Sequence, residues 1–323
     1  MLFKNAFHLL ADNFILNYKF LLYKVVVALI TLALMVALVY PTVNMLLTGQ
    51  PFKDLVTLIG EFFRAIATGD TVFLQGFSEQ LKQAMADFAV YIGEKTPNLV
   101  YFCVIIVLIA LVSKFLGGMG NFAFGCLIDN KMSSYAKTSF CSAFISNMGR
   151  AALWHLVYVP LTFVYDVFTL LLCGVVFLIL MGIISSGLVA ALAALMVSVA
   201  LLLAAQAVKL TLFNDAVPAF VTDKMRLRDA FRKSFTFTKE RFGRLFSTYL
   251  VTCLLILCLN VLFAVCTFGA GLLITIPMSY LMMICIQFVS YYIYGKRKYF
   301  LGEDKIILPK EKTNENFYDD FEV

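Results

Sequence analysis

Long stretches without a charged residue dominate the second half of the chain. No Asp, Glu, Lys, Arg or His occurs in the 51 residues from 245 to 295, or in the 42 residues from 167 to 208. One helix over the longer stretch would measure about 76 Å, more than twice a hydrocarbon core of about 30 Å. Each stretch is therefore expected to cross a membrane, turn and cross back. Small residues at 269–271 and 185–187 mark the expected turns.

The same pattern predicts six transmembrane helices arranged as three hairpins, because each apolar window is long enough to cross a bilayer. The windows lie near residues 20–40, 98–116, 151–183, 187–213, 245–268 and 272–294. The third is overlong and contains Pro160 and Asp166. It predicts either one long kinked helix or an interfacial segment followed by a shorter span. We therefore expect an all-α polytopic membrane protein with a single membrane domain over 1–295.

Basic residues are distributed unevenly between the segments that connect these spans. Cytoplasmic segments of membrane proteins are enriched in Lys and Arg. With the N-terminus inside, 22 of the 26 bases fall on the inner side, and the outer side holds four bases and six acids. Both termini are therefore expected in the cytoplasm, on the inner face of a plasma membrane. No small-residue cleavage site follows the first apolar run, so the first span is expected to be retained.

Composition agrees with a membrane environment and argues against disulfides. Hydrophobic residues make up 62% of the chain and charged residues 14%, whereas soluble domains contain roughly 25% charged residues. The eight cysteines lie in apolar or cytoplasm-facing stretches, and none lies in the long outer loop. No disulfide is therefore expected.

Short motifs that precede the spans indicate a weak internal repeat. TDKM, KSF and GR stand at 222–225, 233–235 and 243–244, and DNKM, TSF and GR stand at 129–132, 138–140 and 149–150. We interpret them as parts of three parallel units, each an amphipathic interfacial helix followed by a transmembrane hairpin. Chance similarity between short basic segments is the alternative.

Two regions lie outside the predicted spans. The outer loop 41–97 has apolar residues at helical spacing, which predicts two amphipathic helices with Thr71 as the N-cap of the second. These helices are expected to cover the ends of the spans, or else to cap a ligand cavity or dock a protein partner. The tail 296–323 alternates bases and acids and is expected to be a disordered cytoplasmic segment.

Asp166 is the only acidic residue within a predicted span, and an intramembrane carboxylate suggests a functional site. His155 lies three helical turns earlier on the same face, about 16 Å away. One hypothesis is a proton or cation site in a polar cavity that also contains Gln206 or Asn260. The alternative is that Asp166 lies near the outer end of an overlong helix, and that the two amides only form interhelical hydrogen bonds.

Bases interleaved with phenylalanines form the strongest remaining signal, over 224–244. A basic amphipathic helix at a cytoplasmic boundary attracts anionic lipid headgroups, by about 1 kcal/mol per base. The candidate lipid contacts are Arg226, Arg228, Arg232, Lys233, Lys239, Arg241 and Arg244. Phe231, Phe235 and Phe242 are expected to face the bilayer, which argues against nucleic-acid binding. The alternative is that these bases only set the topology.

Enzyme motifs are missing from the sequence. Two histidines are too few for a multi-histidine metal site, and no HExxH, GxSxG or phosphate loop occurs, so no catalytic residue, metal or cofactor is expected. The glycines at 118–123 have the spacing of a dinucleotide fingerprint, but they follow a membrane span, so we reject that interpretation. Small residues at every fourth position over 186–198 predict close helix packing.

From about residue 223 onward, the chain contains DAFRKSFTFTKERFGRLFSTYLV, an apolar hairpin with Ile276-Pro277, and YYIYGKRK. This pattern resembles a loose group of uncharacterised bacterial multi-spanning membrane proteins, which includes the membrane domain attached to some glycerophosphodiester phosphodiesterases. The resemblance implies a bacterial plasma-membrane protein and no particular activity. The sequence thus favours a non-enzymatic protein with a lipid-contacting, scaffolding or accessory role. A small transporter with a polar path through Asp166 is the alternative, and a membrane-embedded enzyme comes third.

Overall fold

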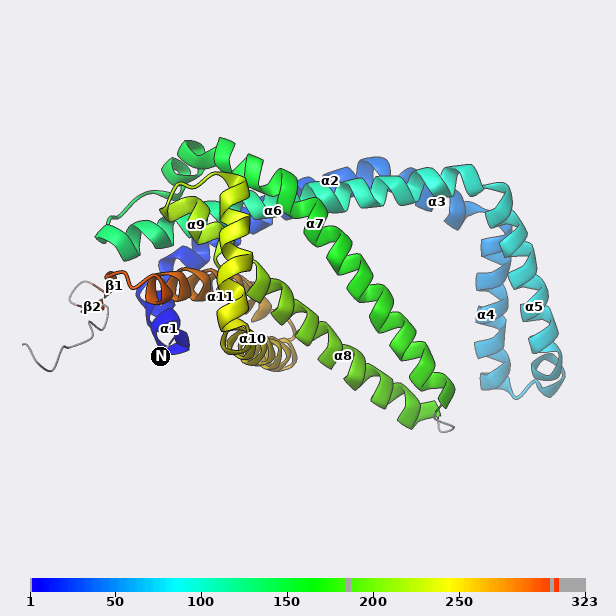
Figure 1. The fold of residues 1–323 in the computed structure, drawn as a ribbon. Helices are drawn as coiled ribbons and strands as arrows, with labels where there is room; N and C mark the ends of the chain where they lie inside the picture. Colours follow the sequence, from blue (N-terminus) through cyan, green and yellow to red (C-terminus); the bar gives the residue numbers. More distant parts are fainter. Residues whose placement is uncertain (1, 184–186, 303–304, 308–323) are drawn as a thin grey trace, which may run out of the picture. The chain divides into compact units, whose positions relative to one another are not determined.

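The computed structural model describes residues 2–183, 187–302 and 305–307, and it is almost entirely helical (Figure 1). Six helical stretches of this described part are long and apolar enough to cross a membrane. They are Ile15–Leu38, Asn98–Ser134, Phe140–Ile183, Val189–Thr222, Arg241–Cys266 and Leu272–Tyr294. The prediction of an all-α, multi-pass membrane protein is therefore confirmed.

The elements follow one another along the chain with short connections. They are α1 (Leu2–Asp12), α2 (Ile15–Leu38), α3 (Tyr40–Thr48), α4 (Gln50–Thr68), α5 (Thr71–Glu94), α6 (Thr96–Ser134), α7 (Phe140–Ile183), α8 (Gly187–Leu212), α9 (Ala216–Thr222), α10 (Leu227–Cys266), α11 (Leu272–Tyr294), β1 (Tyr299–Gly302) and β2 (Lys305–Ile307). They form two compact units. The larger unit contains 1–25 and 115–323, and the smaller unit contains 26–114.

Two of the expected lead-in segments are continuous with the spans that follow them. α10 runs unbroken for 40 residues and α7 for 44 residues, with Pro160 inside α7. No proline separates either lead-in from its span, so nothing stops the helix from propagating. The third predicted span is therefore part of one long helix. In Figure 1 the yellow first part of α10 and its gold second part run in different directions, so the lead-in and the span remain distinct within one helix.

α8 packs between α7 and α10 in the larger unit. Ala190 and Ala194 of α8 are completely buried. Their spacing of four residues places both on one face of the helix, where a neighbouring backbone approaches closely. The close packing predicted from the small residues is therefore found in the described part of this stretch, although residue 186 lies outside it.

The N-terminal helix and the C-terminal strands pack together. α1 lies against α11 and β1, and the side-chain amide of Asn5 donates a hydrogen bond to the Tyr299 hydroxyl at 2.8 Å. β1 and β2 form an antiparallel pair in which Tyr299 is opposite Ile307. Tyr299 and Leu301 are buried because alternate residues of a strand face the same side. The prediction of a disordered tail is thus wrong as far as Ile307, and residues 308–323 lie outside the described part.

The smaller unit contains the helices of the predicted outer loop. α4 and α5 pack against each other, with the rings of Phe62 and Phe77 stacked at 4.2 Å between centroids. Gly69 ends α4 in the left-handed conformation, with φ of 72°. Asp70, rather than Thr71, caps α5 by accepting a hydrogen bond from the Phe73 backbone N–H at 3.1 Å. α3 is a further short helix that the sequence pattern did not indicate.

Candidate functional site

Asp166 of α7 forms an ion pair with Lys209 of α8. The ammonium nitrogen lies 2.7 Å from one carboxylate oxygen, and the two side chains are only 23% and 14% exposed. Next to this pair, the Tyr165 hydroxyl donates to the Ala205 carbonyl at 2.7 Å, which gives the two helices a second polar link. The carboxylate therefore has a counter-ion from the same chain.

The ion pair stands at the two ends of the charge-free stretch 167–208. From the pair to the turn, α7 contributes 17 residues and α8 contributes 22. At 1.5 Å per residue these lengths are about 26 and 33 Å, close to the thickness of one hydrocarbon core. The pair is therefore about one membrane thickness away from the turn. The expectation that Asp166 lies near the turn-side, outer end of its helix is wrong, because its partner Lys209 sits at the opposite end of the hairpin.

His155 does not join Asp166 in a common site. It is buried, and its Nδ1 lies 2.8 Å from the Ala151 carbonyl. Its ring meets the rings of Phe115 and Phe122 edge to face. It also fits closely against α6, since a Cβ atom added at Gly118 would lie 2.2 Å from the imidazole. The histidine and this glycine thus serve helix packing, in agreement with the rejection of a dinucleotide fingerprint.

Gln206 and Asn260 also remain apart from the ion pair. No hydrogen bond connects either amide to Asp166 in the described part of the chain. The Oδ1 atom of Asn260 is buried without a hydrogen-bond partner. The four residues proposed as an intramembrane polar site therefore do not assemble into one, and Lys209 is the group that meets the carboxylate.

A second group of charges, the Asp223 cluster, consists of Asp223, Lys233, Tyr291 and Arg297. One carboxylate oxygen of Asp223 receives the Lys233 ammonium at 2.8 Å and the Tyr291 hydroxyl, and the other receives the Arg297 guanidinium at 2.6 Å. Burial alone would raise the pKa of Asp223, but the hydrogen bonds from its partners outweigh burial and hold the pKa below its usual value. The cluster joins the connection after α9 to α10, α11 and the start of the tail.

Further buried hydrogen bonds surround this cluster. Asp129 of α6 accepts from the hydroxyl groups of Thr222, at 2.7 Å, and Tyr292, at 2.8 Å. Asn214 donates to Ser290 at 2.7 Å and accepts from the Tyr249 hydroxyl at 2.5 Å. These bonds connect α6, α9, α10 and α11 at one end of the larger unit. Because their donors and acceptors satisfy each other, the arrangement rigidifies the bundle.

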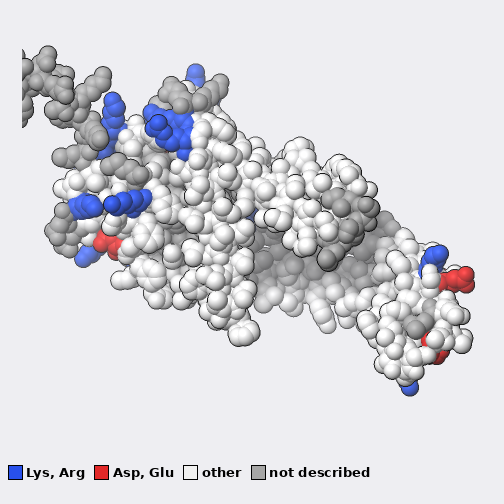
Figure 2. Space-filling view, turned by 90° about the horizontal axis from the view of Figure 1, so that it is seen from below, with Lys and Arg blue, Asp and Glu red and all other residues white. Residues whose placement is uncertain are grey.

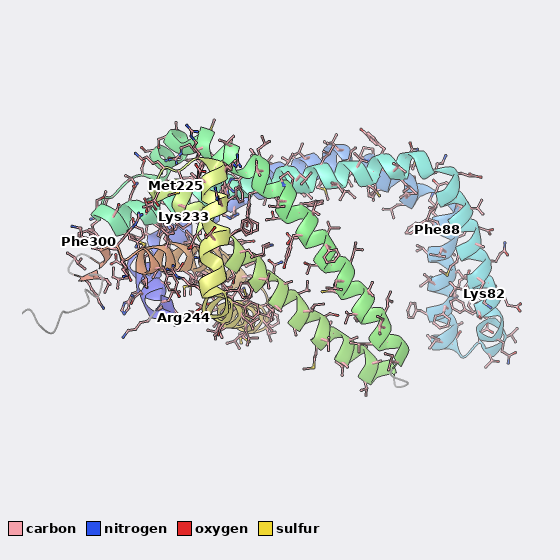
Figure 3. The ribbon with its side chains drawn as sticks, viewed as in Figure 1. Lys82, Phe88, Met225, Lys233, Arg244 and Phe300 are labelled. Carbon is pink, nitrogen blue, oxygen red and sulfur yellow. The ribbon has the colours of Figure 1, made fainter. Side chains whose placement is uncertain are left out.

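The basic lead-in of α10 divides into exposed and inward-facing residues. Arg226, Arg228, Arg232 and Arg244 are exposed. Lys233 belongs to the Asp223 cluster, and the Arg241 guanidinium stacks on the Tyr294 ring at 4.4 Å. The side chain of Lys239 lies outside the described residues. Figure 3 shows Met225, Lys233 and Arg244 in succession down the first part of α10, and Figure 2 shows Lys and Arg gathered at the end of the molecule that carries the tail.

The phenylalanines of this lead-in do not share one face toward the bilayer. Phe231 stacks on Trp154 of α7, with 4.6 Å between ring centroids and 14° between the planes. Phe235 and Phe242 are exposed. The expectation that all three face lipid is therefore wrong for Phe231, because a neighbouring helix provides an equally apolar surface.

Sequence reasoning missed the partners of both carboxylates. Lys209 had been assigned to the cytoplasmic bases, although the two ends of a charge-free hairpin must lie at the same depth. That rule would have paired it with Asp166. No comparable signal exists for Asp223, whose partners Tyr291 and Arg297 are 68 and 74 positions away.

Metal and family comparisons add no assignment. The described residues contain no group of three or more His, Cys, Asp or Glu side chains that could hold a metal ion. No protein-family model, curated protein or solved structure matches the chain. The resemblance to bacterial multi-spanning membrane proteins therefore stays a prediction.

Proposed function

We propose that this chain is a non-catalytic plasma-membrane protein with a lipid-contacting and scaffolding role, and that both of its termini are cytoplasmic. The observation that carries the proposal is the exposed half of the α10 lead-in. Four arginines project from it, and the apolar rings of Phe235 and Phe242 are exposed on the same segment. A helix surface with bases beside aromatic rings suits a membrane interface, where headgroups meet the bases and acyl chains meet the rings.

The transporter alternative rested on an intramembrane carboxylate without a partner. Lys209 neutralises that carboxylate, and the pair stands about one membrane thickness from the turn of its hairpin. No cation from solution is needed to balance the charge. The ion pair is therefore assigned a structural role, as a fastener at one edge of the α7–α8 hairpin, and the transporter loses its main support.

Matching contacts support the interpretation of an internal repeat. Asp223 and Lys233 form an ion pair at 2.8 Å across the connection into α10. The equivalent residues of the preceding unit, Asn130 and Thr138, form a hydrogen bond at 3.2 Å across the connection into α7. In both cases a side chain near the end of one helix holds the start of the next, which suits a scaffold built from related units.

The proposal is tested by neutralising the exposed arginines in the full-length protein. The variant carries Arg226→Gln, Arg228→Gln, Arg232→Gln and Arg244→Gln. Its matched control removes four bases from the smaller unit by the changes Lys53→Gln, Arg64→Gln, Lys82→Gln and Lys95→Gln. Binding of phosphatidylglycerol and phosphatidylcholine to the detergent-purified proteins is measured at low and high salt.

The arginine variant should lose most of its preference for phosphatidylglycerol, since each base near the headgroups contributes about 1 kcal/mol. Added salt should weaken the preference of the parent protein through screening. The control should resemble the parent. An unchanged preference in the arginine variant would contradict the lipid-contacting role and leave these bases as topology signals.

A further inference from the structure

Lys24 of α2 has an unusual environment for a lysine. Its ammonium nitrogen donates to the Gly117 carbonyl of α6 at 3.2 Å. The same nitrogen lies 5.0 Å from the ring centroid of Phe20 and 4.9 Å from that of Tyr280 on α11. An ammonium group has three N–H donors, and only one of them has an acceptor here. Two donors therefore remain for a ligand.

The residues around this ammonium leave room for it. A Cβ atom added at residue 117 would lie 3.2 Å from the Lys24 nitrogen, which is tighter than ordinary contact. Gly117 thus allows the ammonium to approach the α6 backbone. The two aromatic rings present their electron-rich faces, which attract a cation without neutralising it. The surroundings favour a positive charge at this position but supply no negative one.

The ion pairs of the described residues involve other bases. Lys209 is paired with Asp166, and both Lys233 and Arg297 are paired with Asp223. No acidic side chain of the described chain lies within ion-pair distance of Lys24. A partly buried cation of this kind needs a counter-charge, because the removal of water disfavours the charged form. The missing anion must come from outside the chain.

The depth of Lys24 indicates where that anion resides. A stretch of 28 residues without charge, 25–52, begins directly after it. Lys24 therefore marks the edge of the apolar region, as Asp166 and Lys209 do for the α7–α8 hairpin. In the α7–α8 hairpin the edge carries an acid and a base, whereas Lys24 stands at its edge as a base alone. Lipid phosphates are the anions that lie at the edge of a hydrocarbon core.

We infer that Lys24, Gly117 and Tyr280 form a binding site for the phosphate group of an anionic lipid. The neighbouring surface suits acyl chains, since Leu22 of α2 and Ile276 of α11 are exposed apolar residues. Tyr280 is 46% exposed, so its ring borders both the ammonium and the surface. The site deepens the proposed lipid-contacting role, on which it rests, by adding one defined position distinct from the arginines of α10.

The test compares Lys24→Gln with Lys19→Gln in the full-length, detergent-purified protein. Lys19 is exposed on the same helix, so its replacement removes the same charge without touching the site. Phosphatidylglycerol is titrated and the bound lipids are counted by native mass spectrometry. Loss of one base should weaken the tightest phosphatidylglycerol site about fivefold in Lys24→Gln. The tightest site of Lys19→Gln should be unchanged, and phosphatidylcholine binding should not differ among the three proteins.

Two further variants keep the charge of Lys24 and guard against misfolding. Gly117→Ala places a methyl group against the ammonium, and Tyr280→Leu removes the aromatic ring but keeps an apolar surface. Both should weaken the tightest phosphatidylglycerol site while helix content measured by circular dichroism stays that of the parent. Unchanged lipid binding in Lys24→Gln and in both of these variants would overturn the inference.

The source of the phosphate is distinguished by competition. An excess of inorganic phosphate should not displace the tightest phosphatidylglycerol molecule, because acyl chains contribute to its binding. Displacement by inorganic phosphate would overturn the lipid assignment in favour of a free-anion site. If the arginine variant loses its lipid preference while Lys24→Gln binds like the parent, the proposed function stands and this inference fails.

Discussion

Lys209 reaches Asp166 across the α7–α8 hairpin, from 43 positions away in the sequence, and its ammonium joins the two ends of a charge-free stretch. Each residue would be costly alone at the edge of an apolar region. Together they are close to neutral, and Tyr165 adds a hydrogen bond next to them. The pair therefore holds the register of the hairpin without placing an isolated charge at its edge.

Replacing one member of this pair should destabilise the protein more than replacing both. Lys209→Met leaves Asp166 without its counter-ion and should cost about 2 kcal/mol, and Asp166→Asn should cost a similar amount. The double variant should recover at least half of the combined loss, because no uncompensated charge remains. Unfolding in detergent, followed by circular dichroism, measures all three variants. Strictly additive losses would contradict the coupling.

The Asp223 cluster should make stability depend on pH in the acid range. The pKa of Asp223 is lower in the folded protein than its usual value of about 3.9. A depressed pKa contributes stability above the unfolded value, and that contribution disappears as pH falls through the folded value. Stability should therefore fall below about pH 4. Asp223→Asn should lose about 1–2 kcal/mol at pH 7 and flatten this part of the profile.

The exposed acid Asp12 provides the control for this pH profile. Asp12→Asn should keep the acid-range slope of the parent, because the three partners of Asp223 remain in place. A slope that survives in Asp223→Asn would show that another group causes it.

The stacking of Phe231 on Trp154 should be visible in fluorescence. Trp154 is the only tryptophan of the chain, and its side chain is almost completely buried. Phe231→Ala should shift its emission to longer wavelength and cost about 3 kcal/mol, because it opens a cavity beside the indole. Phe242→Ala, at an exposed ring, should leave the emission unchanged. Equal effects of the two changes would indicate that Phe231 faces lipid after all.

Topology is tested by labelling single cysteines in a background without native cysteines. Gly69→Cys in the α4–α5 turn should react with a membrane-impermeant thiol reagent on intact cells, and Lys305→Cys in β2 should react only after lysis. The reverse pattern would overturn the proposed orientation of the termini.

The sequence predicted the spans well because charge is excluded from a hydrocarbon core wherever a helix crosses it. The ends of the charge-free stretches also carry information that was not used, since they place Asp166 and Lys209 at one depth. The direction of Phe231 was not predictable in this way. Lipid chains and protein side chains are similarly apolar, so an apolar stripe does not reveal which of them it contacts.

The Asp223 cluster shows a different limit. Its partners come from α10, α11 and the start of the tail, and only the assembled bundle brings them together. The ordered strands β1 and β2 were missed because a charged, polar tail pattern concealed the alternation of Tyr299 and Leu301. Short strands of this kind are stabilised by the surface on which they pack.

The contact of α1 with α11 and β1 has a consequence for synthesis in the cell. A helix of 11 residues is marginal on its own, and the buried face of α1 is completed by segments that leave the ribosome last. During translation the N-terminal helix must wait, with its apolar face unoccupied, until those segments arrive. A chain interrupted before α11 would keep that face exposed, and a protease or chaperone that recognises it would distinguish unfinished chains from finished ones.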